Sequence, residues 1–214
     1  MMRKTLYDYN IREPLFDFLE ETYGKVRIIE EKMMGKSRAD IIAITDGIII
    51  GMEIKSDADT YVRLSRQVED YDKFFDKNCV VVGESHSMHV REHVPDYWGI
   101  IVAQQTEQGI VFNIQREPLY NPKLDWQKKL GILWRPELAH IQELNDMPKY
   151  KDRSKVFVIE KIAQRIPYDV LKYQITEELF ERDYTTIADR INEYRVSNGQ
   201  KKRRKRKRKK NTMK

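Results

Sequence analysis

Two acids and a lysine are the residues of this chain best suited to chemistry, and a short local pattern brings them together. Two isoleucine-rich runs are joined by Asp46-Gly47. An Asp-Gly pair between apolar runs is a strong signal for a hairpin with a two-residue type I′ turn. In that register Asp40 faces Glu53. Side chains alternate along a strand, so Lys55 lies on the same face as Glu53.

The facing carboxylates require a cation close by. Directly facing residues have Cβ atoms about 4.5–5.5 Å apart, and like charges in such pairs are unfavourable. A divalent ion would relieve the repulsion between Asp40 and Glu53, and Mg²⁺ or Mn²⁺ suits both carboxylate ligands and phosphate oxygens. Lys55 beside this pair suits a phosphate as the reacting group. The hairpin therefore predicts metal-dependent chemistry on a phosphate.

The composition indicates one or two domains in a reducing compartment. Apolar residues make up 40% of the 214-residue chain, which is enough for a core, and Cys79 as the single cysteine excludes a disulfide framework. No apolar run reaches the roughly 18 residues that a membrane span needs. The first residues lack the apolar stretch of a secretory signal. We therefore expect a soluble protein of the cytoplasm.

The net charge of +6 conceals an uneven distribution, because the last segment is strongly basic and the rest of the chain is mildly acidic. A block of like charges repels itself and is expected to be disordered. It also suits the phosphate backbone of a nucleic acid, although a solubility tail or a nuclear-import-like signal is an alternative interpretation. The residues of this block expected to contact nucleic acid are Lys201, Lys202, Arg203, Arg204, Lys205, Arg206, Lys207, Arg208, Lys209 and Lys210.

The apolar spacing predicts an α/β or α+β fold around a mixed sheet. A helix is expected over 11–22, with Asn10 as its N-cap and Gly24 as its stop. The later elements expected are a strand over 26–29, the two hairpin strands, a helix from 57–60 to about residue 75, a buried strand over 79–83, a short helix over 86–94, and strands over 98–103 and 110–114. This order describes an αβββαβ core followed by a peripheral hairpin.

Three parts are expected along the chain. The core with its peripheral hairpin covers residues 1–116, a helical region covers 117–198, and the disordered polybasic tail covers 199–214. Helices of the second part are expected to begin at Pro136, after Ser154, at Pro167 and near residue 185.

Two tripeptides in this setting resemble the motif of the PD-(D/E)xK nuclease superfamily. They are Arg-Ala-Asp at 38–40 and Glu-Ile-Lys at 53–55, and the similarity covers about residues 10–85. Ala39 replaces the proline of the motif, a departure that removes no ligand. The resemblance implies a restriction-endonuclease-like core. In the order of its expected parts, the whole chain resembles small bacterial and phage proteins that join such a core to a helical C-terminal region.

The resemblance implies a role for each residue of the motif. Asp40 and Glu53 would be metal ligands, and the backbone carbonyl of Ile54 would be a further one. The metal would lower the pKa of a bound water and stabilise the transition state. Lys55 would be the catalytic lysine, which orients or helps to deprotonate the attacking water or offsets developing negative charge.

The helix after the hairpin carries a second match. Gln67 and Tyr71 fit the Gln-x-x-x-Tyr motif of the RecB-like branch of the superfamily, which implies that both belong to the active site. Residues four apart share a helix face, so Arg63 lies on the same stripe. Arg63 could face the substrate strand, and Arg38 beside Asp40 could contact the substrate or pair with a nearby acid. The alternative for the stripe is an exposed helix edge with Tyr71 packed against the sheet.

A further acid often comes from the first helix of such nucleases. Glu13 is the best candidate for this additional metal ligand, because it lies near the start of the expected helix. Glu20 and Glu21 compete with it, and Glu30 at the end of the first strand is another candidate. The alternative for each is a solvated surface acid.

Outside the hairpin, two other segments carry functional signals. Residues 133–166 resemble a SAP-type DNA-binding helix pair, in which Arg153 and Lys155 would contact phosphates; a helical lid packed on the core is the alternative. His86, His89 and His93 have a spacing that would share one helix face, but a polar surface helix is a better interpretation than a zinc site.

The three tryptophans, Trp98, Trp126 and Trp134, are better interpreted as core or domain-contact residues than as base-stacking platforms.

Together these signals predict a metal-dependent nuclease that hydrolyses phosphodiester bonds, with DNA as the expected substrate. A non-catalytic DNA-binding or DNA-repair accessory protein with a nuclease-like core, or an interaction protein with a basic tail, remains an alternative. The sequence does not decide whether the substrate is DNA or RNA, or whether it is single-stranded, duplex or branched. It also leaves open whether cleavage is endonucleolytic or exonucleolytic, and whether two chains pair as a homodimer.

Overall fold

The structure, a computed structural model, describes residues 5–182 of the chain. Residues through Phe180 belong to one compact unit, and the residues from Glu181 onward form a second unit. The helix expected near 185–195 and the polybasic tail lie outside the described residues, as does the boundary expected at residue 198. The predicted division at residue 116 stays a prediction.

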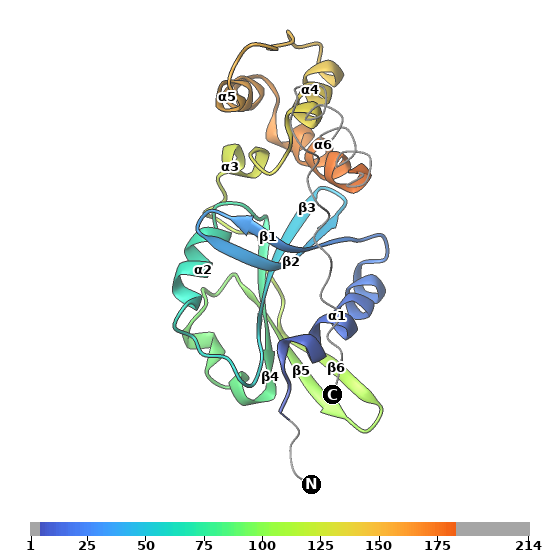
Figure 1. Cartoon of the computed structure of the whole chain (residues 1–214), viewed down its shortest axis with the longest axis vertical. Helices are drawn as coiled ribbons and strands as arrows, with labels where there is room; N and C mark the ends of the chain where they lie inside the picture. The colour runs from blue at the N-terminus through green and yellow to red at the C-terminus, as the bar shows by residue number, and fades with distance from the viewer. Residues whose placement is uncertain (1–4, 183–214) are drawn as a thin grey trace, which may run out of the picture. The chain divides into compact units, whose positions relative to one another are not determined.

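Within residues 5–182, six strands form one mixed sheet in the order β1-β2-β3-β4-β5-β6 (Figure 1). The strands are β1 (Arg27–Met34), β2 (Ser37–Thr45), β3 (Ile48–Lys55), β4 (Lys77–Gly83), β5 (Gly99–Thr106) and β6 (Gly109–Arg116). The pairs β1–β2, β2–β3 and β5–β6 are antiparallel, whereas β3–β4 and β4–β5 are parallel. The hairpin expected at the periphery therefore extends the central sheet, with β6 at its edge.

The central hairpin has the predicted register. Thr45 pairs with Ile48 across a turn in which Gly47 has a φ of 70°, and Ile41 pairs with Met52. Glycine adopts this left-handed φ without steric cost. Asp46 does not have a positive φ, so the two-residue turn is present but is not the predicted type I′, which requires a positive φ at both central residues. The local Asp-Gly signal was therefore sufficient to set this register.

The apolar character of the central strands follows from burial on both faces. Helix α1 (Asp8–Tyr23) packs on one face against a cluster that includes Ile41 and Ala43. Helix α2 (Leu64–Tyr71) covers the other face, where Ile42 and Ile44 are buried. A strand between two layers has no solvent face, so its sequence does not alternate between apolar and polar residues.

Two predicted helices differ in extent from the observed elements. Helix α1 begins at Asp8, three residues earlier than expected, because Asn10 acts from inside the first turn and its side chain accepts the Tyr7 N–H. Helix α2 ends at Tyr71 rather than near residue 75. The segment expected as a short helix over 86–94 contains two 3-10 turns, Glu84–His86 and Val90–Glu92.

The chain continues after the sheet as short helices, which are α3 (Trp126–Leu130), α4 (Arg135–Leu144), α5 (Lys155–Arg165) and α6 (Tyr168–Glu181). As predicted, Pro136 lies in the first turn of α4, and Ser154 caps α5 by accepting the Phe157 N–H. None of the described helices is long and apolar enough to cross a membrane.

A buried ion pair ties these helices to the sheet. Lys129 of α3 is fully buried and donates to both carboxylate oxygens of Asp76, at 2.8 and 2.6 Å. The Tyr168 hydroxyl donates to the same carboxylate at 2.6 Å, and the Ile49 N–H of β3 does so at 2.7 Å. Asp76 therefore joins a sheet strand to α3 and to the start of α6.

Candidate active site

The centre of the site is the buried carboxylate of Glu53 near the end of β3. Lys55 and Gln67 both contact its Oε1 atom at 2.5 Å, and the Tyr71 hydroxyl donates to Oε2 at 2.6 Å. Lys55 Nζ also donates to Gln67 Oε1 at 3.1 Å, which closes the network. The structure thus brings together the lysine, the glutamate and the Gln-x-x-x-Tyr pair that the sequence indicated.

Two periodicities produce this arrangement. Glu53 and Lys55 are two apart on a strand and share the face that α2 covers. Gln67 and Tyr71 are four apart on α2 and so share the helix face toward the sheet.

The hydrogen bonds of this network offset the free-energy cost of burying two charged side chains. The Glu53 and Lys55 side chains are each only 3% exposed, and a buried charge is tolerated when it is paired and hydrogen-bonded. Burial and the negative charge of Glu53 raise the pKa of Tyr71 well above its ordinary value. Tyr71 therefore stays protonated, and its hydroxyl donates a hydrogen bond to Glu53.

Asp40 lies beside this network and is held by backbone contacts. Its Oδ2 atom accepts the Ile54 N–H at 2.9 Å, and its own N–H donates to the Tyr71 hydroxyl at 3.3 Å. Burial, followed by the charge of Glu53, raises the pKa of Asp40 to about 7, although the Ile54 N–H and Arg12 act in the opposite direction. The unfavourable like-charge pair inferred from the hairpin register is therefore present in the fold.

This raised pKa gives the first prediction. Asp40→Asn should stabilise the metal-free protein at pH 8 by roughly 2–4 kcal/mol, since a neutral amide avoids the cost of the buried charge. A carboxyl group whose pKa is higher in the folded state stabilises the fold at low pH, and this contribution is lost as the pH rises from about 4 to 7. Urea unfolding in EDTA from pH 4 to 8.5 measures the free energy of unfolding of both proteins. The stability advantage of Asp40→Asn over the wild type should grow as the pH rises from about 4 to 7.

Asp70 provides the matched control for this titration. Although burial opposes the change, hydrogen bonds from the Ser37 hydroxyl and the Lys36 N–H lower the pKa of Asp70. Asp70→Asn should therefore destabilise the protein near neutral pH, opposite in sign to Asp40→Asn. A stability difference for Asp40→Asn that stays constant with pH would contradict the raised pKa.

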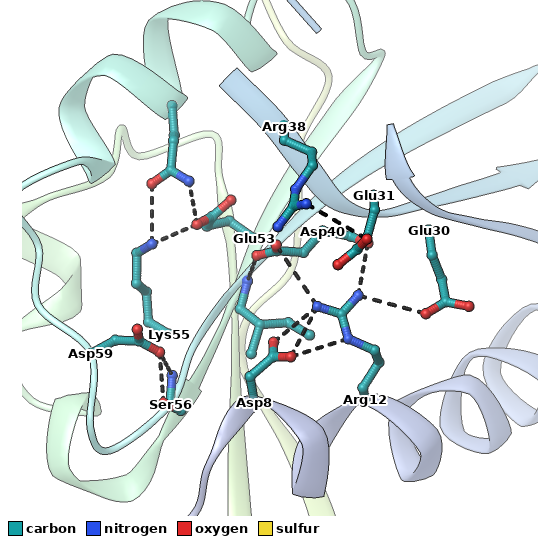
Figure 2. A network of polar contacts seen from close by, with 12 residues as sticks. Asp8, Arg12, Glu30, Glu31, Arg38, Asp40, Glu53, Lys55, Ser56 and Asp59 are labelled. Carbon is teal, nitrogen blue, oxygen red and sulfur yellow. Dashed lines mark hydrogen bonds and ion pairs between the residues drawn. The ribbon is translucent and has the colours of Figure 1, made fainter. Parts of the chain in front are cut away.

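Arg12 of α1 was not anticipated by the sequence reasoning and is central to a second set of contacts (Figure 2). Its Nη1 donates to the backbone carbonyl of Asp40 at 3.1 Å, and its Nη2 lies 3.8 Å from the Asp40 carboxylate. Arg12 also pairs with Asp8 at 3.0 Å and lies 3.8 Å from Glu30. This helix therefore supplies a cation that fixes Asp40, from the opposite face of the sheet to α2.

The first-helix acid nearest the site is Asp8 rather than Glu13. Asp8 lines the cleft beside Asp40 and pairs with Arg12, whereas Glu13 is exposed and does not line that cleft. Glu30 lies 3.8 Å from Arg12, and its side chain is 39% exposed and does not line the cleft. The spacing of four between Asp8 and Arg12 was a signal in the sequence, but the expected helix started too late to include Asp8.

These groups line a cleft of about 500 Å³. Its wall includes acids and the catalytic-lysine candidate, and its rim includes cations from the β1–β2 turn, β2 and α2. The charged and amide residues of this cleft are Asp8, Arg12, Glu31, Lys36, Arg38, Asp40, Glu53, Lys55, Asp59, Arg63, Arg66 and Gln67.

The donor set of the cleft fits a hard divalent cation in its chemistry. Asp40 and Glu53 offer carboxylate oxygens, and a cation would offset both the burial and the like charge of Glu53 that raise the pKa of Asp40. Within residues 5–182, no three His, Cys, Asp or Glu side chains gather closely enough to form a complete metal site. The ligand roles of Asp40, Glu53, Ile54, Glu13 and Glu30 stay predictions.

The residues expected to bind nucleic acid have different surroundings. Arg38 and Arg63 are exposed at the cleft, and Arg38 pairs with Glu31 at 3.6 Å. On the helix pair formed by α4 and α5, Arg153 lies over the Phe157 ring, and Lys155 donates to the Gly131 carbonyl at 2.7 Å. Lys155 therefore has a structural contact between α5 and the end of α3.

The histidines form an aromatic group rather than one face of a helix. Tyr61 stacks on His93 with ring centroids 4.0 Å apart and meets the edge of His86 at 4.8 Å. His89 points elsewhere and pairs with Glu92. Trp98 is fully buried, as expected of a core tryptophan.

Comparisons with known proteins relate the chain to a phage protein. A family model described as bacteriophage P4 protein cII matches residues 1–206. Protein cII of Enterobacteria phage P4 is 25% identical over 143 residues, which are 65% of this chain and 54% of that protein. The match thus spans about half the length of this curated relative. The structure of Pyrococcus furiosus SfsA in complex with Ca²⁺ shares 15% sequence identity, with a TM-score of 0.34, over 55% of this chain and 67% of that chain.

Proposed function

The chain belongs to the bacteriophage P4 protein cII family, and we propose that it is a metal-dependent nuclease that hydrolyses phosphodiester bonds in DNA. The observation that carries this proposal is the contact of Lys55 with Glu53 and Gln67 beside Asp40, at the wall of a cation-rimmed cleft. Buried groups with perturbed protonation that face an open cleft, rather than the inside of a core, are typical of catalytic sites.

Asp40, Glu53 and the Ile54 carbonyl would hold Mg²⁺ or Mn²⁺. When bound, such an ion supplies a Lewis acid and lowers the pKa of a water molecule. The protein's own groups prepare the site. Tyr71 and Gln67 fix the orientation of Glu53 through their hydrogen bonds.

Lys55 would offset the negative charge that develops on the phosphate in the transition state. Its Nζ atom lies in the cleft wall and donates to Glu53 and Gln67, so its position is fixed before substrate arrives. A preorganised cation of this kind needs little reorganisation during the reaction.

The rim and the tail support nucleic acid as the substrate. Arg63 and Arg66 are exposed at the cleft, and among residues 5–182 neither side chain forms an ion pair. The basic block at 201–210 would add affinity for a phosphate backbone that depends on salt and not on sequence.

The direct test is cleavage of labelled single-stranded, duplex and branched DNA, and of RNA, by the full chain in Mg²⁺, Mn²⁺ or EDTA. We expect cleavage with either metal, none in EDTA, and a loss of at least about 10²-fold in Asp40→Asn. Cleavage that persists in EDTA would overturn the mechanism. Salt-sensitive binding of nucleic acid without cleavage under any condition would favour a non-catalytic binding protein.

A further inference from the structure

A second pocket adjoins the cleft and shares part of its rim. It has a volume of about 430 Å³ and is lined by residues of the β1–β2 turn, of α2 and its C-terminal end, and of α3. Lys36 and Arg66 line both the cleft and this pocket. A ligand that extends out of the cleft between these two cations therefore enters the second pocket.

Positive charge predominates in the second pocket. Lys36, Arg66, Lys73 and Lys128 line it, against Glu69 and Asp70. The Asp70 carboxylate is engaged within the fold, because it accepts hydrogen bonds from the Lys36 N–H and the Ser37 hydroxyl. It anchors the turn that presents the Lys36 side chain.

The cations of the second pocket are accessible to the phosphate groups of a nucleic-acid strand. Lys36 and Arg66 are exposed, and among the described residues neither side chain has an ion-pair partner. The side chains of Lys73 and Lys128 are 42% and 49% exposed and each lies 3.5 Å or more from its partner acid. Such long contacts between exposed groups are weak and exchange readily for a phosphate.

The pocket also offers an aromatic surface. Phe74 lines it and is only half-buried. Single-stranded nucleic acids bind in grooves that combine cations along the backbone with aromatic rings on which bases stack. The volume is within the roughly 300–1,000 Å³ of ordinary ligand sites.

We propose that this second pocket is a nucleotide-binding subsite that holds the substrate strand on one side of the bond cut in the cleft. The proposal rests on the proposed function in that it takes the cleft as the place of cleavage. Lys36 and Arg66 guide the backbone from one cavity to the other, Lys128 and Lys73 neutralise the next phosphate, and Phe74 stacks on a base. The enzyme therefore requires nucleotides on one defined side of the scissile bond.

Binding tests the subsite without any need for catalysis. The full chain is titrated in EDTA with a fluorescent single-stranded oligonucleotide, and anisotropy gives the Kd over a series of salt concentrations. The double variant Lys73→Ala/Lys128→Ala removes two cations that line the second pocket and not the cleft. It should bind about tenfold or more weakly and should show a salt slope smaller by about 1.4. The double variant Lys149→Ala/Lys161→Ala, which removes two cations that line neither cavity, is the matched control and should bind as the wild type does.

Cleavage then locates the subsite relative to the cut. Substrates extended one nucleotide at a time on the 5′ or the 3′ side should show a fall in KM with extension on one side only. Lys73→Ala/Lys128→Ala, which changes only cations that line the second pocket and not the cleft, should abolish that fall and change kcat little. Phe74→Leu keeps an apolar side chain but removes the aromatic ring. It should reduce the fall in KM that an added nucleotide with a base produces, and it should leave unchanged the fall in KM that an added abasic nucleotide produces.

The outcomes separate the two proposals. Cleavage with an unchanged KM in Lys73→Ala/Lys128→Ala would overturn the subsite and leave the nuclease. Weaker binding by the same variant, in a protein that cuts nothing, would overturn the nuclease and leave a strand-binding pocket. A wild-type protein that neither binds nor cuts would overturn both.

Discussion

Replacing Lys55 with methionine is expected to lower the rate of cleavage by roughly 10²–10³-fold, which is the cost of removing one preorganised group that stabilises transition-state charge. The Lys55 ammonium group is buried beside Glu53, 2.5 Å from its carboxylate, whereas Lys36, which also lines the cleft, is exposed. Methionine is unbranched and one atom shorter than lysine, and it removes the ammonium group together with its hydrogen bonds to Glu53 and Gln67. The measurement is the single-turnover rate at saturating substrate, normalised to the folded fraction.

The control for this variant is a lysine in a similar environment outside the cleft. Lys129 is also buried and also paired with an aspartate, at 2.6 Å, but it does not line the cleft. Lys129→Met should keep the cleavage rate of each folded molecule, even though it lowers stability. If Lys55→Met and Lys129→Met lost activity in proportion to their lost stability, Lys55 would be a structural residue and the catalytic role would be excluded.

The second large effect is on stability, at the contact between the sheet and the later helices. Asp76→Ala should lower the free energy of unfolding by roughly 3–5 kcal/mol, because it leaves the charge of Lys129 buried without its partner. The change also leaves the Ile49 N–H and the Tyr168 hydroxyl without their acceptor. Urea unfolding followed by circular dichroism measures the difference.

A double variant separates the ion pair from the packing around it. Asp76→Leu/Lys129→Met removes both charges together, and replacing a whole buried pair by apolar residues is often nearly neutral. The double variant should therefore be more stable than Asp76→Ala. Equal losses in the two proteins would show that the ion pair is not the source of the effect.

Local sequence signals were sufficient to predict the hairpin that carries Asp40, Glu53 and Lys55. Asp46-Gly47 set the turn, the alternation of side chains put Glu53 and Lys55 on one face, and the spacing of four put Gln67 and Tyr71 on one helix face. Each of these relations spans few residues, so backbone geometry alone decides it. The mixed sheet around the hairpin was predicted correctly from the order of the helices and strands along the chain.

Contacts between residues far apart in the sequence could not be predicted from such local patterns. Arg12 and Asp40 are 28 residues apart, and Lys129 and Asp76 are 53 apart. No periodicity connects such pairs, and which charges meet depends on how α1 and α3 pack on the sheet. Asp8 was missed because the expected helix began at residue 11, and which acid of the first helix lies at the cleft depends on how α1 packs on the sheet.

Strand and helix periods fix which side chains share a face, so the order of residues was enough to show which members of the hairpin and of α2 could act together. Their surroundings depend on how the helices pack on the sheet. Packing of α1 against one face of the sheet brought Arg12 to Asp40, and packing of α2 against the other closed the network around Glu53. The same packing placed the cations of the β1–β2 turn and of α2 around two adjoining pockets, because these segments are neighbours in space and not in the chain.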